Sequence, residues 1–306
     1  MSEAMAPRHA APRPRTLAFA LPIGVAVTAL GSLWALADVP ALEVVEQPAP
    51  AVAMQLPPVD VEATVAADPC ADAAVQTAIA AGDDSGTIAA FGGGEAFRAS
   101  VAAGNAPCIS LSDPDRIWVV VNKARPLAPE FTPTGLVSTR LQTTTTAGSL
   151  RAEPAGAINA LAAGLADAGA GVLGANNAYR SYGMQENTYS RHVSATGQQA
   201  AEEVSARPGY SEHQTGLALD VVSCSSGCGG IRAFGGTAES AWVNAHAWEY
   251  GYIVRYAEGE TPITGYAPEP WHLRYIGPEL AAAYHAGGYT TLEEFFGLPA
   301  APDYPG

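Results

Sequence analysis

Two short segments carry most of the chemistry of this chain. The first, Ser211 to Asp220, reads Ser-Glu-His-Gln-Thr-Gly-Leu-Ala-Leu-Asp, and the second, at 269–272, reads Glu-Pro-Trp-His. Together they supply two histidines, His213 and His272, and one aspartate, and the second segment adds a spare glutamate. Two imidazoles and one carboxylate leave the fourth position of a tetrahedral zinc ion open for water, whereas structural zinc sites are closed. The pattern indicates a hydrolytic zinc site in which the extra carboxylate takes the proton of the water.

The spacing of these residues predicts two strands. Residues 217–222 are apolar except for Asp220, and alternation along a strand places Asp220 on one face and the neighbouring leucines on the other. Gly216 allows a turn that folds His213 back toward Asp220. Residues 271–276 form the second predicted strand, and Pro270 predicts a bend that brings Glu269 and His272 to the same side.

These residues also carry a family resemblance. The stretch Ser-Ala-Arg-Pro-Gly-Tyr-Ser-Glu-His-Gln-Thr-Gly at 205–216 resembles the signature of the VanY-type D-alanyl-D-alanine carboxypeptidases. Three further motifs resemble that family in the expected order: Val-Asn-Lys with Arg-Pro-Leu at 121–127, Tyr-Arg-Ser-Tyr at 179–182 with Gln185, and the Glu-Pro-Trp-His segment. The resemblance covers roughly residues 113–297 and implies the fold shared with lysostaphin-type peptidases and the hedgehog signalling domain.

The resemblance implies a role for individual residues. It implies one zinc ion per chain, and it assigns the ligands to His213, Asp220 and His272. Glu269 matches the catalytic glutamate, and Arg180 matches an arginine that holds the substrate and neutralises the developing oxyanion. Gln185 and Ser211 match positions that line the substrate pocket. The chain departs from the family pattern at two places, Tyr210 and the insert Cys-Ser-Ser-Gly-Cys at 224–228.

Composition excludes some classes of partner. The formal net charge is −15, which argues against nucleic acid as a partner because phosphate binding needs a basic surface. The hydrophobic fraction of 48% is enough for a sizeable core. A serine acyl-enzyme of the penicillin-binding type is excluded, because Ser-x-x-Lys is absent and the only lysine, Lys123, follows Val-Val-Asn.

The beginning of the chain has the pattern of an export signal. Residues 1–15 hold three arginines and read as a cytoplasmic tail, and residues 16–37 are uncharged and mostly apolar. That stretch is long enough to be a transmembrane anchor, but Ala-Leu-Ala at 35–37 would suit a cleaved signal peptide, so both alternatives stay open. Residues 38–66 read as a Pro/Ala-rich linker. Either way the remainder is expected outside the cytoplasm, with the membrane a partner only if the segment is uncleaved.

The cysteines agree with export, because an even number in an exported chain predicts disulfides. Four cysteines can pair in three ways, and we favour the pattern in which both disulfides are local, because each then joins residues of one region. The alternative is a second metal site that uses Cys224 and Cys228, but two further ligands are not evident nearby. The favoured pairs are Cys70 with Cys108 and Cys224 with Cys228.

The remaining sequence predicts an α+β fold with a small, mostly antiparallel sheet flanked by helices. Strands and helices alternate without βαβ regularity. The β-branched run at 117–121 reads as a strand, and residues 67–112 read as a small helical cap held by a disulfide. A zinc peptidase domain at 113–297 and a tail at 298–306 complete the predicted organisation.

The expected function is that of an exported zinc D,D-carboxypeptidase that uses metal-activated water to remove the terminal D-alanine from peptidoglycan stem peptides. One alternative is a peptidoglycan endopeptidase on the same fold. The other is a non-catalytic, zinc-containing wall-binding module, and the presence of Glu269 and Arg180 beside the three ligands argues against it.

Overall fold

The computed structural model describes residues 68–145 and 148–305. The predicted cytoplasmic tail, the anchor or signal peptide and the linker therefore lie outside the described residues. In the described ranges, no helix is both long enough and apolar enough to cross a bilayer.

A five-stranded sheet forms the centre of the fold, in the order β2-β4-β5-β7-β6. The outer pair β2–β4 is parallel, and the other three pairs are antiparallel. A separate two-stranded antiparallel sheet pairs β1 with β3. The strands are β1 (Leu136–Ser138), β2 (Gln142–Thr143), β3 (Ser149–Arg151), β4 (Leu173–Asn177), β5 (Ala218–Ser223), β6 (Tyr252–Tyr256) and β7 (Glu269–Tyr275).

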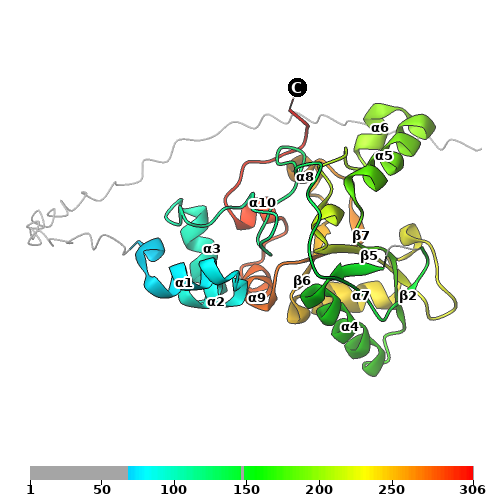
Figure 1. Cartoon of the computed structure of the whole chain (residues 1–306). Helices are drawn as coiled ribbons and strands as arrows, with labels where there is room; N and C mark the ends of the chain where they lie inside the picture. The colour runs from blue at the N-terminus through cyan, green and yellow to red at the C-terminus, as the bar shows by residue number, and fades with distance from the viewer. Residues whose placement is uncertain (1–67, 146–147, 306) are drawn as a thin grey trace, which may run out of the picture. The chain divides into compact units, whose positions relative to one another are not determined.

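Helices lie on both sides of this sheet. Figure 1 shows α4 (Ala152–Asp167) and α7 (Ala238–His246) below the sheet, and α5 (Tyr182–Thr196) and α6 (Gln198–Glu202) above it. The buried side chains of α4, such as Ile158, Leu161 and Leu165, recur at helical spacing and face the core. The structure confirms the predicted α+β class with a small, mostly antiparallel sheet. The short 3₁₀ helices are Pro69–Ala71, Glu212–Thr215, Ile231–Ala233 and Ala247–Tyr250.

The N-terminal helical region shares its core with the rest of the described chain. Its three helices are α1 (Ala73–Ala81), α2 (Asp84–Ala90) and α3 (Gly94–Ala102). Helix α3 packs against α9 (Pro278–Ala286), and the rings of Phe97 and Trp118 lie 5.0 Å apart. The described residues accordingly belong to one compact unit. The remaining helices are α8 (Thr261–Thr264) and α10 (Leu292–Phe295).

The run at 117–121 is not a strand, and this prediction was wrong. Its residues are fully buried but irregular, and the carbonyl oxygens of Ile117 and Val119 accept hydrogen bonds from the Arg274 guanidinium at 3.0 and 2.6 Å. A buried carbonyl group needs a partner. Here a distant side chain supplies that partner in place of a neighbouring strand.

The C-terminal segment after residue 297 packs onto the unit. The Ala301 N–H donates to the carbonyl of Ile263 at 2.8 Å, and the carbonyl of Pro302 accepts from Lys123 Nζ at 3.1 Å. The Tyr304 hydroxyl accepts from the N–H of Arg207 at 2.9 Å. The segment that we predicted as a tail is thus fixed to the rest of the described chain.

Both predicted disulfides are present, and the described residues contain no free cysteine. Cys70 and Cys108 close a loop with a sequence separation of 38, whereas Cys224 and Cys228 are separated by only 4 residues.

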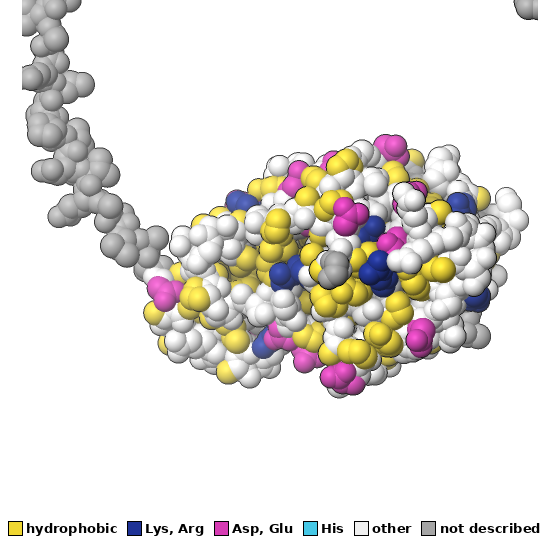
Figure 2. Space-filling model, turned by 90° about the horizontal axis from the view of Figure 1, so that it is seen from above, with side chains coloured by type: hydrophobic (Ala, Val, Ile, Leu, Met, Phe, Trp, Pro, Cys, Tyr) yellow, Lys and Arg dark blue, Asp and Glu magenta, His cyan; other side chains and the backbone are white. Residues whose placement is uncertain are grey.

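Figure 2 shows one face of the molecule, on which acidic and basic side chains are interspersed and no continuous basic patch forms.

The two disulfides should differ in their contribution to stability. Chain-entropy arithmetic gives about 4 kcal/mol for a loop with a separation of 38 and about 2 kcal/mol for one of 4. We expect the double variant Cys70→Ala/Cys108→Ala to lose more free energy of unfolding than Cys224→Ala/Cys228→Ala, as measured by denaturant titration. The opposite order would show that loop length does not decide their contributions.

Two helical glycines should respond oppositely to alanine. A Cβ atom on Gly94 would clash with the backbone carbonyl of Glu279, where α3 crosses α9. A Cβ atom on Gly156, in α4, would meet nothing within 4 Å. Alanine in a helix is favoured over glycine by about 0.5–1 kcal/mol. Thermal unfolding should therefore show Gly156→Ala stabilised and Gly94→Ala destabilised, and equal shifts would refute the close packing of α3 on α9.

Candidate active site

A tight turn delivers His213 to the sheet. The 3₁₀ helix Glu212–Thr215 ends at Gly216, whose φ of 70° lies in the left-handed region that glycine adopts without strain. The Thr215 hydroxyl donates to the carbonyl of Glu212 at 2.6 Å and accepts from the N–H of Leu217 at 3.0 Å. The turn therefore joins directly to β5 and holds His213 beside the strand that carries Asp220.

The pairing of β5 with β7 places Asp220 directly opposite His272. Residues opposite one another in an antiparallel pair point to the same face of the sheet, with Cβ atoms about 4.5–5.5 Å apart. Asp220 Oδ1 lies 3.3 Å from His272 Nδ1, and Asp220 Oδ2 lies 3.4 Å from His213 Nε2. The strand register alone thus brings the aspartate and the second histidine together.

An irregularity in β7 brings Glu269 to the same side. Val254 of β6 pairs with Leu273, so a regular register would pair Tyr256 with Trp271, but Tyr256 pairs with Glu269 instead. The two extra residues of β7 include Pro270, which has no N–H to donate to a ladder. The predicted bend is present, and it leaves Glu269 Oε2 at 3.5 Å from His272 Nδ1.

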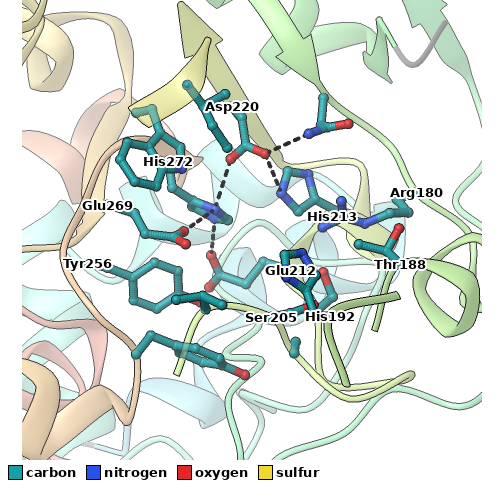
Figure 3. A pocket seen from close by; sticks show the side chains of 17 residues that line it. Arg180, Thr188, His192, Ser205, Glu212, His213, Asp220, Tyr256, Glu269 and His272 are labelled. Atoms are coloured by element: carbon teal, nitrogen blue, oxygen red, sulfur yellow. Dashed lines mark hydrogen bonds and ion pairs between the residues drawn. The ribbon is translucent and has the colours of Figure 1, made fainter. Parts of the chain in front are cut away.

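The three predicted ligands converge with a geometry that suits a metal ion (Figure 3). Their ligand atoms all lie within 4.8 Å of one another, and all three residues are buried. Asp220 Oδ1 is buried without a hydrogen-bond partner, whereas Asp220 Oδ2 accepts from Asn177 Nδ2 at 3.1 Å. A buried carboxylate oxygen without a hydrogen bond is costly unless a cation compensates for it. The donor set therefore fits a divalent metal.

Each imidazole has one nitrogen directed at this point and the other held by protein. His213 Nδ1 lies 2.7 Å from the carbonyl oxygen of Ala178, to which it donates, so that Nε2 faces Asp220. His272 has the reverse arrangement, because Nδ1 faces Asp220 while Nε2 lies 3.3 Å from Glu212 Oε2. Such outer partners fix the orientation of metal-binding histidines.

The surroundings of the site shift the pKa values of its titratable groups in different directions. Burial raises the pKa of Glu269 to about 7; the Asp220 carboxylate acts in the same direction, and His272 and Arg180 oppose it. Burial alone would lower the pKa of His272, but the nearby carboxylates of Asp220 and Glu212 raise it to about 9. Burial lowers the pKa of His213. A glutamate with a pKa near neutrality can both accept and return a proton.

The remaining predicted residues divide into two groups. Arg180 and Ser211 line the cavity of about 140 Å³ at this site, and the Nε of Arg180 has no hydrogen-bond partner within the described residues. Gln185 does not line the cavity. It is buried behind the wall, where its Nε2 donates to the carbonyl of Ala206 at 2.6 Å.

The structure adds residues that sequence reasoning did not single out. Glu212 and Asn177 contact the predicted ligands, and Tyr256, Tyr266 and His192 line the cavity. His192 reads in the sequence as an ordinary helical histidine. The only signal for Glu212 was its position directly before His213, and nothing in the sequence distinguished it from a solvent-exposed acid.

Comparisons with known proteins identify the family of this chain. The family model described as "VanY: D-alanyl-D-alanine carboxypeptidase" matches residues 148–278. The "Putative carboxypeptidase YodJ" of Bacillus subtilis is 37% identical over 191 residues, which are 61% of this chain and 69% of that protein. A D-alanyl-D-alanine carboxypeptidase of Enterococcus faecium is 37% identical over 120 residues, which are 39% of this chain and 35% of the relative.

A solved structure of the LdcB LD-carboxypeptidase, described as revealing the molecular basis of peptidoglycan recognition, is also similar. It superimposes with a TM-score of 0.56 at 38% identity, and the match covers 60% of this chain and 87% of that chain. The matched sequence and the converging site together place this chain in the VanY family of D-alanyl-D-alanine carboxypeptidases.

Proposed function

We propose that this chain is an exported, zinc-dependent D,D-carboxypeptidase that removes the terminal D-alanine from peptidoglycan stem peptides. The observation that supports it most is the convergence of His213, Asp220 and His272 on one cavity, with Glu269 beside them as a carboxylate that is not needed as a ligand. The two disulfides support action outside the cytoplasm, where such bonds persist.

The metal contributes one part of the chemistry. When bound by His213, Asp220 and His272, zinc would polarise the scissile carbonyl and lower the pKa of a water molecule. Glu269 takes a proton from the attacking water as the new C–O bond forms. It returns that proton to the leaving amine as the C–N bond breaks, which releases free D-alanine.

Arg180 has the properties of a group that meets negative charge on the substrate. Its backbone N–H donates to the carbonyl of His213 at 3.1 Å, which ties it to the site, and its side chain lines the cavity. A guanidinium presents several donors in a fixed plane, which suits a carboxylate or a developing oxyanion. Ser211 adds a hydroxyl to the same wall.

A second candidate is removal of D-alanine that follows an L-configured centre. The similarity to the LdcB LD-carboxypeptidase, at 38% identity over 87% of that chain, favours it specifically. Both reactions release D-alanine, so the two candidates differ in the residue on the acyl side of the bond. Mass spectrometry of products from a pentapeptide ending in D-Ala-D-Ala, and from the corresponding tetrapeptide, separates them. Cleavage of the pentapeptide supports the first candidate, and cleavage of the tetrapeptide alone supports the second.

Replacing Glu269 by glutamine should remove the proton carrier and leave the ligands in place. Proton transfer by a positioned side chain typically contributes about 10²–10⁴-fold in rate, so we expect Glu269→Gln to lose at least about 100-fold in kcat with full zinc content. Glu258→Gln, at an exposed position after β6, serves as the matched control and should keep its activity. Loss of zinc from Glu269→Gln would instead show that Glu269 is a ligand.

Zinc binding should depend on pH through His272. Because its pKa is raised to about 9, metal-free His272 is positively charged at neutral pH, and the metal must displace a proton. The apparent zinc affinity should therefore rise by up to about tenfold per pH unit toward pH 9, as measured by chelator competition corrected for chelator protonation.

A zinc affinity that does not change between about pH 6 and 8 would contradict this assignment of the His272 pKa.

The raised pKa of His272 also affects the stability of the protein without metal. The stabilisation by the positive charge of His272 is fully present below about pH 6.5 and is lost as the pH rises through about 9.

A further inference from the structure

Glu212 is a buried carboxylate that the proposed reaction does not use. It is 1% exposed, and in Figure 3 it approaches His272 from the side away from Asp220. Its Oε2 is 3.3 Å from His272 Nε2, whereas Asp220 and Glu269 approach Nδ1. Glu212 lines the same cavity, but it contacts the ring nitrogen that does not face the point shared by His213 and Asp220.

The other oxygen of Glu212 is held by two arginines. Oε1 accepts hydrogen bonds from Arg255 Nε at 2.9 Å and from Arg274 Nη1 at 2.8 Å. All three side chains are completely buried. With Oε1 occupied in this way, the carboxylate has a fixed orientation, and Oε2 is directed at the imidazole.

The arginines are themselves held in place by further partners. Arg255 makes a bidentate ion pair with Glu293, with N–O distances of 2.8 and 3.0 Å. Glu293 also accepts a hydrogen bond from Asn122 Nδ2 at 2.9 Å. Arg274 donates to the carbonyls of the irregular segment at 117–121 and, through Nε, to the carbonyl of Tyr275 at 3.0 Å. Two arginines and two glutamates balance in formal charge, so the network can remain ionised in the interior.

We propose that Glu212 is a positioning residue that sets the tautomer and the ring orientation of His272. Its carboxylate accepts the proton on Nε2, which leaves the lone pair of Nδ1 directed at the point shared by His213 and Asp220. In a neutral imidazole one nitrogen is a donor and the other an acceptor, so an acceptor fixed at Nε2 determines which nitrogen can bind a metal. The inference rests on the zinc site of the proposed function.

The matched variants Glu212→Gln and Glu293→Gln separate this role from a general need for buried charge. Both remove one carboxylate from the same buried network, but only Glu212 contacts His272. In Glu212→Gln the oxygen of the amide remains with the arginines, and its NH₂ group donates to Nε2, which favours the wrong tautomer.

Zinc affinity measured by chelator competition is the first readout. We expect Glu212→Gln to bind zinc about 10–100-fold more weakly than the wild type and Glu293→Gln to differ from it much less. Equal losses in the two variants would assign the effect to the charge network as a whole. Unchanged affinity in Glu212→Gln would also overturn the proposal.

A second readout needs no variant and applies even if Glu212→Gln does not fold. In zinc-loaded wild-type protein with ¹⁵N-labelled histidine, NMR should find the His272 proton on Nε2 and none on Nδ1. A loaded protein with the proton on Nδ1 would overturn the role of Glu212 and leave the zinc site standing. A wild-type protein that takes up no zinc would overturn the zinc site itself.

Discussion

The register between β5 and β7 is the constraint on which the site depends. It sets Asp220 opposite His272, and the turn at Gly216 adds His213 from the residues just before β5. Because strand side chains alternate between faces, a slip of one residue would turn Asp220 toward the apolar face of the sheet. Leu219 and Val221, both fully buried, stabilise the observed register by occupying that face. The same alternation that builds the core thus also builds the site.

The interior beside the site contains charged side chains. Buried charges of this kind are tolerated only when each has an oppositely charged partner. Arg255 and Arg274 meet Glu212 and Glu293 with no exposure to solvent. Burial alone would raise the pKa of Glu212, but the charges of the two arginines hold it well below its ordinary value. The network joins β6 and β7 to α10 and to the segment at 117–121, so the wall behind His272 is built from distant parts of the chain.

The sequence predicted what local patterns determine. The strands that carry Asp220 and His272, the turn at Gly216 and the bend at Pro270 all follow from alternation and backbone preferences, and the family resemblance supplied the roles. Contacts between distant side chains were not predictable in this way. The run at 117–121 has the composition of a strand, but its carbonyl groups accept hydrogen bonds from Arg274. Gln185 donates a hydrogen bond to the carbonyl of Ala206 instead of lining the cavity. No periodicity in a single sequence reports such pairings.

The most direct test of the central claim is anomalous X-ray diffraction at the zinc absorption edge, on crystals of the chain purified without chelators. The account predicts one anomalous peak per chain, bounded by His213 Nε2, His272 Nδ1 and a carboxylate oxygen of Asp220, at the ligand distances of about 2.0–2.2 Å typical of zinc. A peak that is absent, that lies elsewhere, or that is bound through His272 Nε2 would contradict it.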